Sequence, residues 1–562
     1  MLESLNKKQR NWVERTFSML STEQKLGQMV CELGNTFANI TDYQKWLKKY
    51  PVGSMFIGAE VIDPHSAALD AVKKLTSKID GNVKIPMLYC GDFEDGIGTA
   101  IGGFTALPRL MGLSAMGDPK MAYEYGRIIA EEGRCLNIRW AFGPVSDLNL
   151  NRDNPITNAR CAGDDPDHSL KILKNIQQGM QDHGCAACPK HFPGDGTDTR
   201  NQHYVTSLNL LSREEWDRQH GRVFKELIDA GAMSIMIGHL GFPACEPVDE
   251  KKGLFRPATV SKRLMTDLLR GELGFKGIIL TDALSMCGYK SWGRYDERIL
   301  DAFNGGVDVF LWPETEQFFE VMLAALRDGR ASMERLDDSV RRVLAFKALL
   351  GLNEVAIPVD AAKLPAMLKH NNAIADKIAE NSITLLRNRK CHLPLKLKKG
   401  ARILMLVTPN QPTPKSKLVP FYKMFLARGY DVTYGGFADY HPTASVIEHF
   451  DAVFLLCNAQ PHYHDHRGYD STAWAFMANL KIKKRIIISF GTPYYLYDVA
   501  SADTYVNAYS DNPVTQKAVV KALFGEIPFN GKSPVSVAHC FNFGDGISLK
   551  TTYSKKDECR KK

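Results

Sequence analysis

Short apolar runs alternate with longer amphipathic stretches from about residue 20 to residue 350, and this alternation limits the possible folds more than any other feature of the chain. Helical stretches such as 121–134 and 214–231 separate the apolar runs, which cover residues 55–60, 85–93, 138–147, 186–192, 234–240, 277–285 and 307–312. Strands that alternate with helices build parallel sheets from βα units. The pattern predicts a TIM-like (β/α)8 barrel with one strand not evident in the sequence.

Nearly every apolar run ends in a polar or ionisable residue. These residues are Asp92 and Glu94, Asp147, Lys190 and His191, His239, and Asp282. In a (β/α)8 barrel the C-terminal ends of all strands meet at one face, where active sites are built. A single polar residue at a strand end means little, because strands commonly end at polar turns. A succession of such strand ends indicates an active site in the barrel mouth.

A second alternation of apolar and helical segments begins near residue 373. It comprises the segment 373–388 and the apolar runs 401–407, 451–458, 485–491 and 504–510. This pattern predicts an α/β/α sandwich around a parallel sheet. We therefore expect a catalytic barrel domain over residues 1–355, a linker over 356–372 and a C-terminal sandwich domain over 373–562.

The charge pattern argues against a nucleic-acid partner. The net charge is only +8 over 562 residues, and the lysines and arginines are scattered apart from short segments at 396–399 and 555–562. A solvated surface accounts for such segments, whereas a nucleic-acid groove needs basic residues gathered on one face. We expect a small-molecule substrate and no nucleic acid; the oligomeric state stays open.

The termini and the cysteines predict where the protein is found. Residues 1–12 lack the apolar stretch of a secretory signal, and no window is long and apolar enough to cross a membrane. Twelve dispersed cysteines are typical of free thiols in a reducing compartment. Cys185 and Cys188 form a C-x-x-C motif inside an apolar run without a second pair, which favours core packing over metal or redox chemistry. We expect a cytoplasmic protein without a metal or cofactor.

Three segments carry motifs of recognisable chemistry: GDFEDGIG (91–98), KHFPGDGTDTRNQH (190–203) and GIILTDALSM (277–286). Together they resemble glycoside hydrolase family 3, and in particular its β-N-acetylglucosaminidase branch. KHFPG followed downstream by T-D-x-L-S-M is a specific combination. Residues 381–388 and 522–537 resemble the C-terminal domain of that family, so the resemblance covers nearly the whole chain.

The resemblance implies a catalytic pair, since retaining glycosidases need a nucleophile and a proton donor. Asp282 matches the family's aspartate nucleophile and directly follows the apolar run GIILT; the alternative is a cap of the next helix. His203 matches the histidine that serves as acid/base in this branch. An imidazole titrates near neutrality, so it can both give and take a proton. The alternative is an ordinary solvated loop histidine.

The loop around His203 departs from the branch at two positions. The branch has D-S/T-H, whose aspartate pairs with the histidine, whereas this chain has Asn201-Gln202-His203. A comparable Asp-to-Asn change in a serine-protease triad lowers turnover about 10⁴-fold. Either Asp195 or Asp198 substitutes for the missing carboxylate, or the enzyme is slow or differently tuned. Asp195 itself replaces a histidine of the family's K-H-F-P-G-H-G.

Further residues are expected to hold the sugar, because charged side chains fix a rim of hydroxyls through strong hydrogen bonds. Structural ion pairing is the alternative for each of them. The resemblance points to Asp92, Arg160, Lys190 and His191, and the strand ends add His239 and Asp147 to the pocket wall. The family's E-G-G-R-V-x-R is absent, since residues 94–100 read EDGIGTA. The missing arginines put a peptidoglycan-type substrate in doubt.

The resemblance implies an exo-acting retaining β-glycosidase, and β-N-acetylglucosaminidase is the activity that we expect. The alternatives are a β-glucosidase of the same family, a glycoside phosphorylase and a sugar-binding pseudoenzyme. Such β-glucosidases take an acid/base glutamate from the second domain, and no clear candidate is present here. The histidine-rich segment 460–470 is only a weak metal signal. We interpret it as a polar loop that reaches over the barrel mouth.

Overall fold

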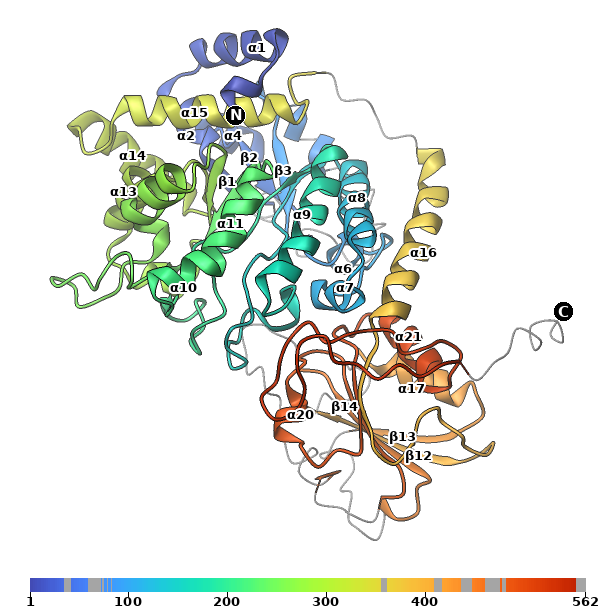
Figure 1. Ribbon diagram of the computed structural model, residues 1–562. Helices are drawn as coiled ribbons and strands as arrows, with labels where there is room; N and C mark the ends of the chain where they lie inside the picture. Colours follow the sequence, from blue (N-terminus) through green and yellow to red (C-terminus); the bar gives the residue numbers. More distant parts are fainter. Residues whose placement is uncertain are drawn as a thin grey trace. The chain divides into compact units, whose positions relative to one another are not determined.

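The computed structural model describes residues 1–34, 42–58, 72, 75–77, 79–81, 83–354, 361–408, 417–435, 447–459, 476–477 and 482–551. The chain divides into two compact units (Figure 1). The first comprises Met1–Thr105, Ala122–Asn151 and Leu173–Leu368, and the second comprises Ala106–Met121, Arg152–Ile172 and Lys369–Lys562. These units follow proximity in space rather than chain order, so the predicted domain boundaries stay predictions. The segment 460–470 lies outside the described residues.

Eight parallel strands of the first unit, among its described residues, close into a ring. In chain order they are β1 (Val30–Leu33), β2 (Ser54–Phe56), β3 (Leu88–Gly91), β4 (Ile138–Ala141), β5 (Ala186–Ala187), β7 (Ser234–Ile237), β9 (Ile278–Thr281) and β10 (Phe310–Leu311). Strands pair in the order β10-β1-β2-β3-β4-β5, and β7 pairs with β9. Parallel bridges Phe192–Ile237 and Leu280–Val309 complete the ring. The predicted (β/α)8-like barrel is confirmed.

The strand that the sequence pattern did not reveal is β1. It begins at Val30, and the single residue Met29 separates it from the end of helix α2 (Thr22–Gln28), so the sequence shows no loop between the two elements. Its sequence VCEL also places a charged residue, Glu32, inside the short apolar run. The helices of this unit include α1 (Lys7–Ser18), α10 (Arg213–Arg218), α11 (His220–Asp229), α12 (Cys287–Lys290), α13 (Tyr295–Gly305), α14 (Thr315–Asp328) and α15 (Met333–Leu349). The larger, C-terminal parts of α8 (Pro119–Cys135) and α9 (Pro166–Asp182) also belong to it.

The barrel interior is filled by apolar and sulfur-bearing side chains. Trp140 of β4 packs edge-on against Phe142 and Phe346, with ring centroids 5.1 and 5.2 Å apart. Cys188 belongs to this core, and Cys185 is buried beside it; both are free thiols. The prediction that the C-x-x-C pair packs in the core is therefore confirmed.

A buried carboxylate joins the starts of β9 and β10 to the outer helices. Asp308 is fully buried; its Oδ2 accepts from the Ile279 amide (3.0 Å) and Arg270 (2.6 Å). Its Oδ1 accepts from Ser339 (2.7 Å) and Arg342 (2.6 Å) of α15. Desolvation by burial raises the pKa of Asp308, but the surrounding guanidinium groups outweigh it and lower the pKa from 3.8 to about 2.

Asp308→Asn is expected to lower the free energy of unfolding by about 3–5 kcal/mol, because it leaves buried guanidinium groups without their counter-charge. The folded pKa lies below the unfolded one, so the carboxylate contributes its full stability above pH 3.8 and loses it as the pH falls through about 2. The difference between the two proteins in urea unfolding should therefore shrink over that range. Asp328→Asn removes an exposed pair with Arg330 and should leave stability near that of the unchanged protein.

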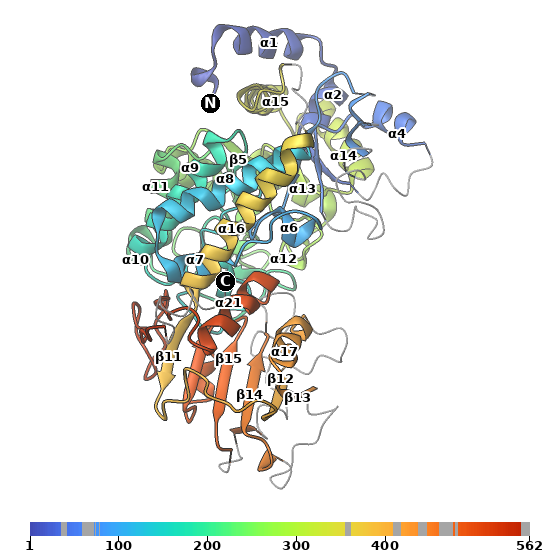
Figure 2. The ribbon, with the colours of Figure 1, turned by 90° about the vertical axis from the view of Figure 1, so that its right-hand side faces the viewer.

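The second unit is a three-layer α/β structure, which confirms the predicted sandwich. Its sheet has the order β11-β16-β15-β14-β12-β13 (Figure 2). All pairs are parallel except β11 with β16. The strands are β11 (Thr384–Asn388), β12 (Arg402–Thr408), β13 (Asp431–Gly435), β14 (Ala452–Cys457), β15 (Arg485–Ser489) and β16 (Thr504–Asn507).

Both faces of this sheet are covered, which is why its strands read as continuous apolar runs. Ile403 and Met405 of β12 share one core with α17 (Val419–Leu426) and α21 (Pro513–Leu523). Leu404 and Leu406 share the other core with α20 (Tyr495–Asp498) and α7 (Leu110–Met116). Helix α16 (Leu364–Ser382) precedes β11 in the chain. No helix among the described residues is long and apolar enough to span a membrane.

Candidate active site

Asp282 directly follows β9, and its amide donates to the carbonyl of Ile237 at the end of β7 (2.9 Å). Its side chain is 14% exposed, and Oδ2 lies 3.9 Å from His191 Nε2. Desolvation by burial is the largest influence and raises the pKa of Asp282. His191, His239, the Ala283 amide and Lys190 together outweigh it and lower the pKa below 3.8. Asp282 is therefore a carboxylate at neutral pH, the form that attacks an electrophilic carbon.

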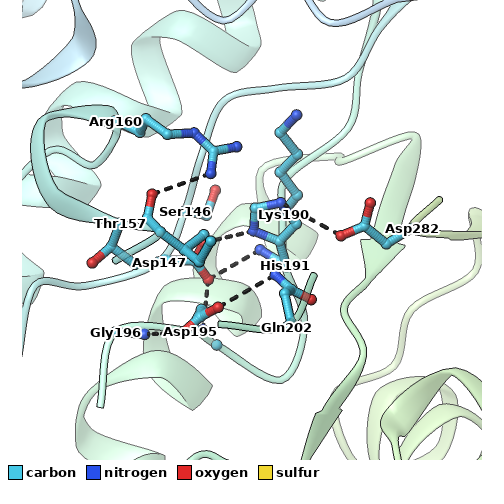
Figure 3. A network of polar contacts seen from close by, with 12 residues as sticks. Ser146, Asp147, Thr157, Arg160, Lys190, His191, Asp195, Gly196, Gln202 and Asp282 are labelled. Carbon is cyan, nitrogen blue, oxygen red and sulfur yellow. Dashed lines mark hydrogen bonds and ion pairs between the residues drawn. The ribbon is translucent and has the colours of Figure 1, made fainter. Parts of the chain in front are cut away.

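His191 is aimed at Asp282 by the buried carboxylate of Asp147 (Figure 3). Asp147 Oδ2 lies 2.7 Å from His191 Nδ1, and Asp147 Oδ1 accepts from the His191 amide at 3.0 Å. Two bonds to one residue fix both the backbone and the ring of His191. A carboxylate at Nδ1 selects the tautomer that carries its proton there.

Lys190 is shared by two carboxylates at the end of β3. Its Nζ lies 2.7 Å from both Asp92 Oδ1 and Glu94 Oε1, and its side chain is only 2% exposed. The side chain of Asp92 is 48% exposed, so it can accept hydrogen bonds from a ligand while Lys190 neutralises it. Glu94 was noted as a polar strand end but was not among the residues expected to hold the sugar, and the structure pairs it with Lys190.

His239 supports the backbone next to the nucleophile. Its Nε2 lies 3.0 Å from the Ala283 carbonyl and its Nδ1 lies 2.7 Å from Thr259 Oγ1. The ring is fully buried and its centroid is 5.5 Å from that of Tyr289. Desolvation by burial lowers the pKa of His239. Both ring nitrogens are thus occupied by protein groups.

His203 is paired with Asn201 inside one short turn. Asn201 Oδ1 accepts from the His203 amide at 2.9 Å and lies 2.8 Å from His203 Nδ1. Because the His203 backbone N–H donates to this atom of Asn201, the atom must be the side-chain oxygen, which can only accept hydrogen bonds. The neutral ring therefore carries its proton on Nδ1 and leaves Nε2 as the basic nitrogen.

The two carboxylates that the sequence offers in place of an aspartate at 201 bind other groups. Asp198 Oδ2 accepts from the Leu208 amide at 2.8 Å and pairs with Arg200 at 2.7 Å. Asp195 accepts from the Gly196 amide and from Gln202, and its own amide donates to Asp147 Oδ1 at 2.7 Å. Asn201 is the partner that the structure gives His203 Nδ1.

Arg160 belongs to the second unit. It ends the short 3-10 helix Asn158–Arg160, and one guanidinium nitrogen donates to the Ile156 carbonyl at 3.1 Å. The other residues that the sequence singled out all lie in the first unit, at or near the C-terminal ends of β3, β4, β5, β7 and β9.

A parallel barrel with an ionised aspartate at a strand end and charged hydrogen-bonding groups beside it has the parts that a retaining glycosidase needs. Residues 21–346 match the model of the glycosyl hydrolase family 3 N-terminal domain. The chain is 32% identical over 547 residues to a β-N-acetylglucosaminidase/β-glucosidase of Cellulomonas fimi, a match that covers 93% of this chain and 95% of the relative. This chain therefore belongs to glycoside hydrolase family 3.

Two solved structures share this architecture. The β-glucoside phosphorylase BglX superposes with a TM-score of 0.85 at 29% identity, covering 95% of this chain and 97% of its own. A family 3 β-N-acetylglucosaminidase from Paenibacillus sp. str. FPU-7 superposes with a TM-score of 0.79 at 28% identity, covering 92% and 99%. Enzymes with hydrolase and phosphorylase names thus share this fold.

Asn201→Asp is expected to move the basic limb of the pH profile of kcat/KM to higher pH by about one unit, because a carboxylate beside the ring favours its protonated form. The proton donor must be protonated for leaving-group departure, so a more readily protonated ring stays competent at higher pH. The measurement is kcat/KM against pH for an aryl glycoside in both proteins. A basic limb that does not move would argue against His203 as the proton donor.

Proposed function

We propose that this chain is a retaining exo-β-glycosidase that forms a covalent glycosyl–Asp282 intermediate and uses His203 as its acid/base. The observation that carries the proposal is the ionised, 14% exposed carboxylate of Asp282 at the tip of β9, faced by His191. A non-reducing-end N-acetyl-β-glucosaminide is the substrate we favour, and a β-glucoside is the alternative. The name of the Cellulomonas fimi relative includes both activities.

The proposed reaction has two steps. In the first, a carboxylate oxygen of Asp282 attacks the anomeric carbon, the glycosidic C–O bond breaks, and protonated His203 gives its proton to the leaving oxygen. In the second, Nε2 of neutral His203 takes a proton from water, whose oxygen displaces Asp282 from the anomeric carbon. Asp282 and His203 end in their starting forms.

The remaining residues divide into two groups in this proposal. Asp92, Lys190 and His191 hold sugar hydroxyls, and we assign Arg160 to the same task by its match to the family. Asp147 and His239 are fully buried and bonded to protein groups, so they act by positioning His191 and the backbone at Asp282.

The first test compares an aryl N-acetyl-β-glucosaminide with the matching aryl β-glucoside. We expect kcat/KM to favour the acetamido sugar, and Asp282→Ala to lower turnover by about 10⁴-fold or more. Asp328→Ala, an exposed substitution, is the matched control and should keep full activity. Preference for the glucoside would contradict the sugar assignment but not the nucleophile. Cleavage of neither sugar would favour a sugar-binding pseudoenzyme.

Phosphorolysis is a second candidate, favoured by Asn201. An amide beside His203 adds no negative charge, so an incoming phosphate meets less repulsion than it would beside an aspartate. The similarity to the phosphorylase BglX agrees with this candidate.

The two candidates differ in their product when phosphate is added. Phosphorolysis should release sugar 1-phosphate in place of the free sugar, and Asn201→Asp should shift the product ratio back towards hydrolysis by about tenfold, since it restores the negative charge. Product analysis by mass spectrometry measures the ratio. Free sugar as the sole product at high phosphate concentration would exclude phosphorolysis.

A further inference from the structure

The turn that carries His203 is anchored by a buried glutamine. Gln202 is only 1% exposed, although it lies in the connection between β5 and the short strand β6 (Ser207–Leu208). Its Nε2 donates to Asp195 Oδ2 at 3.3 Å, and its Oε1 accepts from the His239 amide at 3.0 Å. A flipped side-chain amide would set Nε2 against the His239 N–H, so these two partners fix its orientation.

Backbone hydrogen bonds hold the same turn to the segment that follows β9. The Gln202 carbonyl accepts from the Gly288 amide at 3.1 Å, and the His203 carbonyl accepts from the Cys287 amide at 3.0 Å. A Cβ atom at Gly288 would lie 2.5 Å from the Gln202 carbonyl oxygen, so this approach requires glycine at 288. The turn is therefore docked on the segment that begins with Asp282.

Asp195, the partner of Gln202, is itself fixed to the nucleophile side of the site. Its amide donates to Asp147 Oδ1 at 2.7 Å, and Asp147 Oδ2 binds His191 Nδ1 at 2.7 Å. His191 Nε2 in turn faces Asp282 (Figure 3). A continuous chain of polar contacts thus leads from the turn to the nucleophile, and such networks hold reacting groups in place.

We propose that Gln202 is a positioning residue that holds the turn 201–206 in its docked place and thereby presents His203 to the leaving-group oxygen. This inference rests on the proposed role of His203 as acid/base. Gln202 stands where the resembled branch has serine or threonine, and Asp195 stands where it has histidine. The longer side chain and the new carboxylate reach each other, so the two departures form one contact.

The test reverses the polarity of that contact. Gln202→Glu keeps the side-chain shape and the acceptor for His239, but it sets two carboxylates against each other. Adding Asp195→Asn restores a donor and an acceptor in the opposite sense. We would measure kcat/KM for the phenyl and dinitrophenyl glycosides of the preferred sugar. Phenolate needs a proton to leave, whereas dinitrophenolate leaves without one, so the pair reports proton donation.

Gln202→Glu should lower kcat/KM for the phenyl glycoside by about 10²-fold and for the dinitrophenyl glycoside by less than about threefold. The double variant should recover most of the activity on the phenyl glycoside. A general structural defect would lower both substrates alike. The proposal would be overturned if Gln202→Glu lowered kcat/KM equally for both glycosides or for neither. It would also be overturned if the double variant did not recover activity on the phenyl glycoside.

Two further variants keep the outcome decisive. His203→Ala should show the same difference between substrates, in larger measure. If it affects both substrates alike, the acid/base assignment fails; if it shows the difference and Gln202→Glu does not, only the positioning role fails.

Gly288→Ala displaces the turn from the backbone side without a new buried charge and should also spare the dinitrophenyl glycoside. If Gln202→Glu does not fold, equal losses in Gly288→Ala overturn the proposal.

Discussion

The buried carboxylate of Asp147 is the interaction on which the rest of the site depends. Its two oxygens bind three groups of the segment after β5: the His191 amide, the His191 ring and the Asp195 amide. A fully buried carboxylate is stable only when hydrogen bonds replace its lost hydration, and these three bonds do so. Through them one aspartate in the segment after β4 sets the geometry of the segment after β5.

Charge in the barrel mouth is arranged so that each acidic group has a cationic or hydrogen-bonding neighbour. Lys190 lies between Asp92 and Glu94, and His191 lies beside Asp282. This balance keeps Asp282 ionised although burial opposes the charge. The proton donor that we propose, His203, is held at Nδ1 by an amide in place of the carboxylate of the resembled branch.

Much of the fold followed from periodicity. Seven of the eight barrel strands were visible as apolar runs, five of them ending in polar or ionisable residues, because a parallel strand buried on both faces must be apolar until it reaches the site. The eighth, β1, was not visible because only Met29 separates it from helix α2 and because Glu32 interrupts its short apolar run. The antiparallel edge strand β11 was not expected either, since strand direction depends on which neighbour a strand meets. Segments Ala106–Met121 and Arg152–Ile172 belong to the second unit although they come from the barrel half of the chain.

The sequence by itself determined the residue types, their order and their place at strand ends, because apolar runs and the polar residues that end them can be recognised within short stretches of sequence. It therefore predicted the barrel, the sandwich and the candidate residues Asp282, His203 and Lys190. Only the tertiary structure decided which groups meet. The pairing of Lys190 with Glu94 and the docking of the turn against Gly288 join residues that the closed ring of strands brings together. The contact of Gln202 with Asp195 depends on how the connection after β5 folds. Local sequence carries no information on such distances.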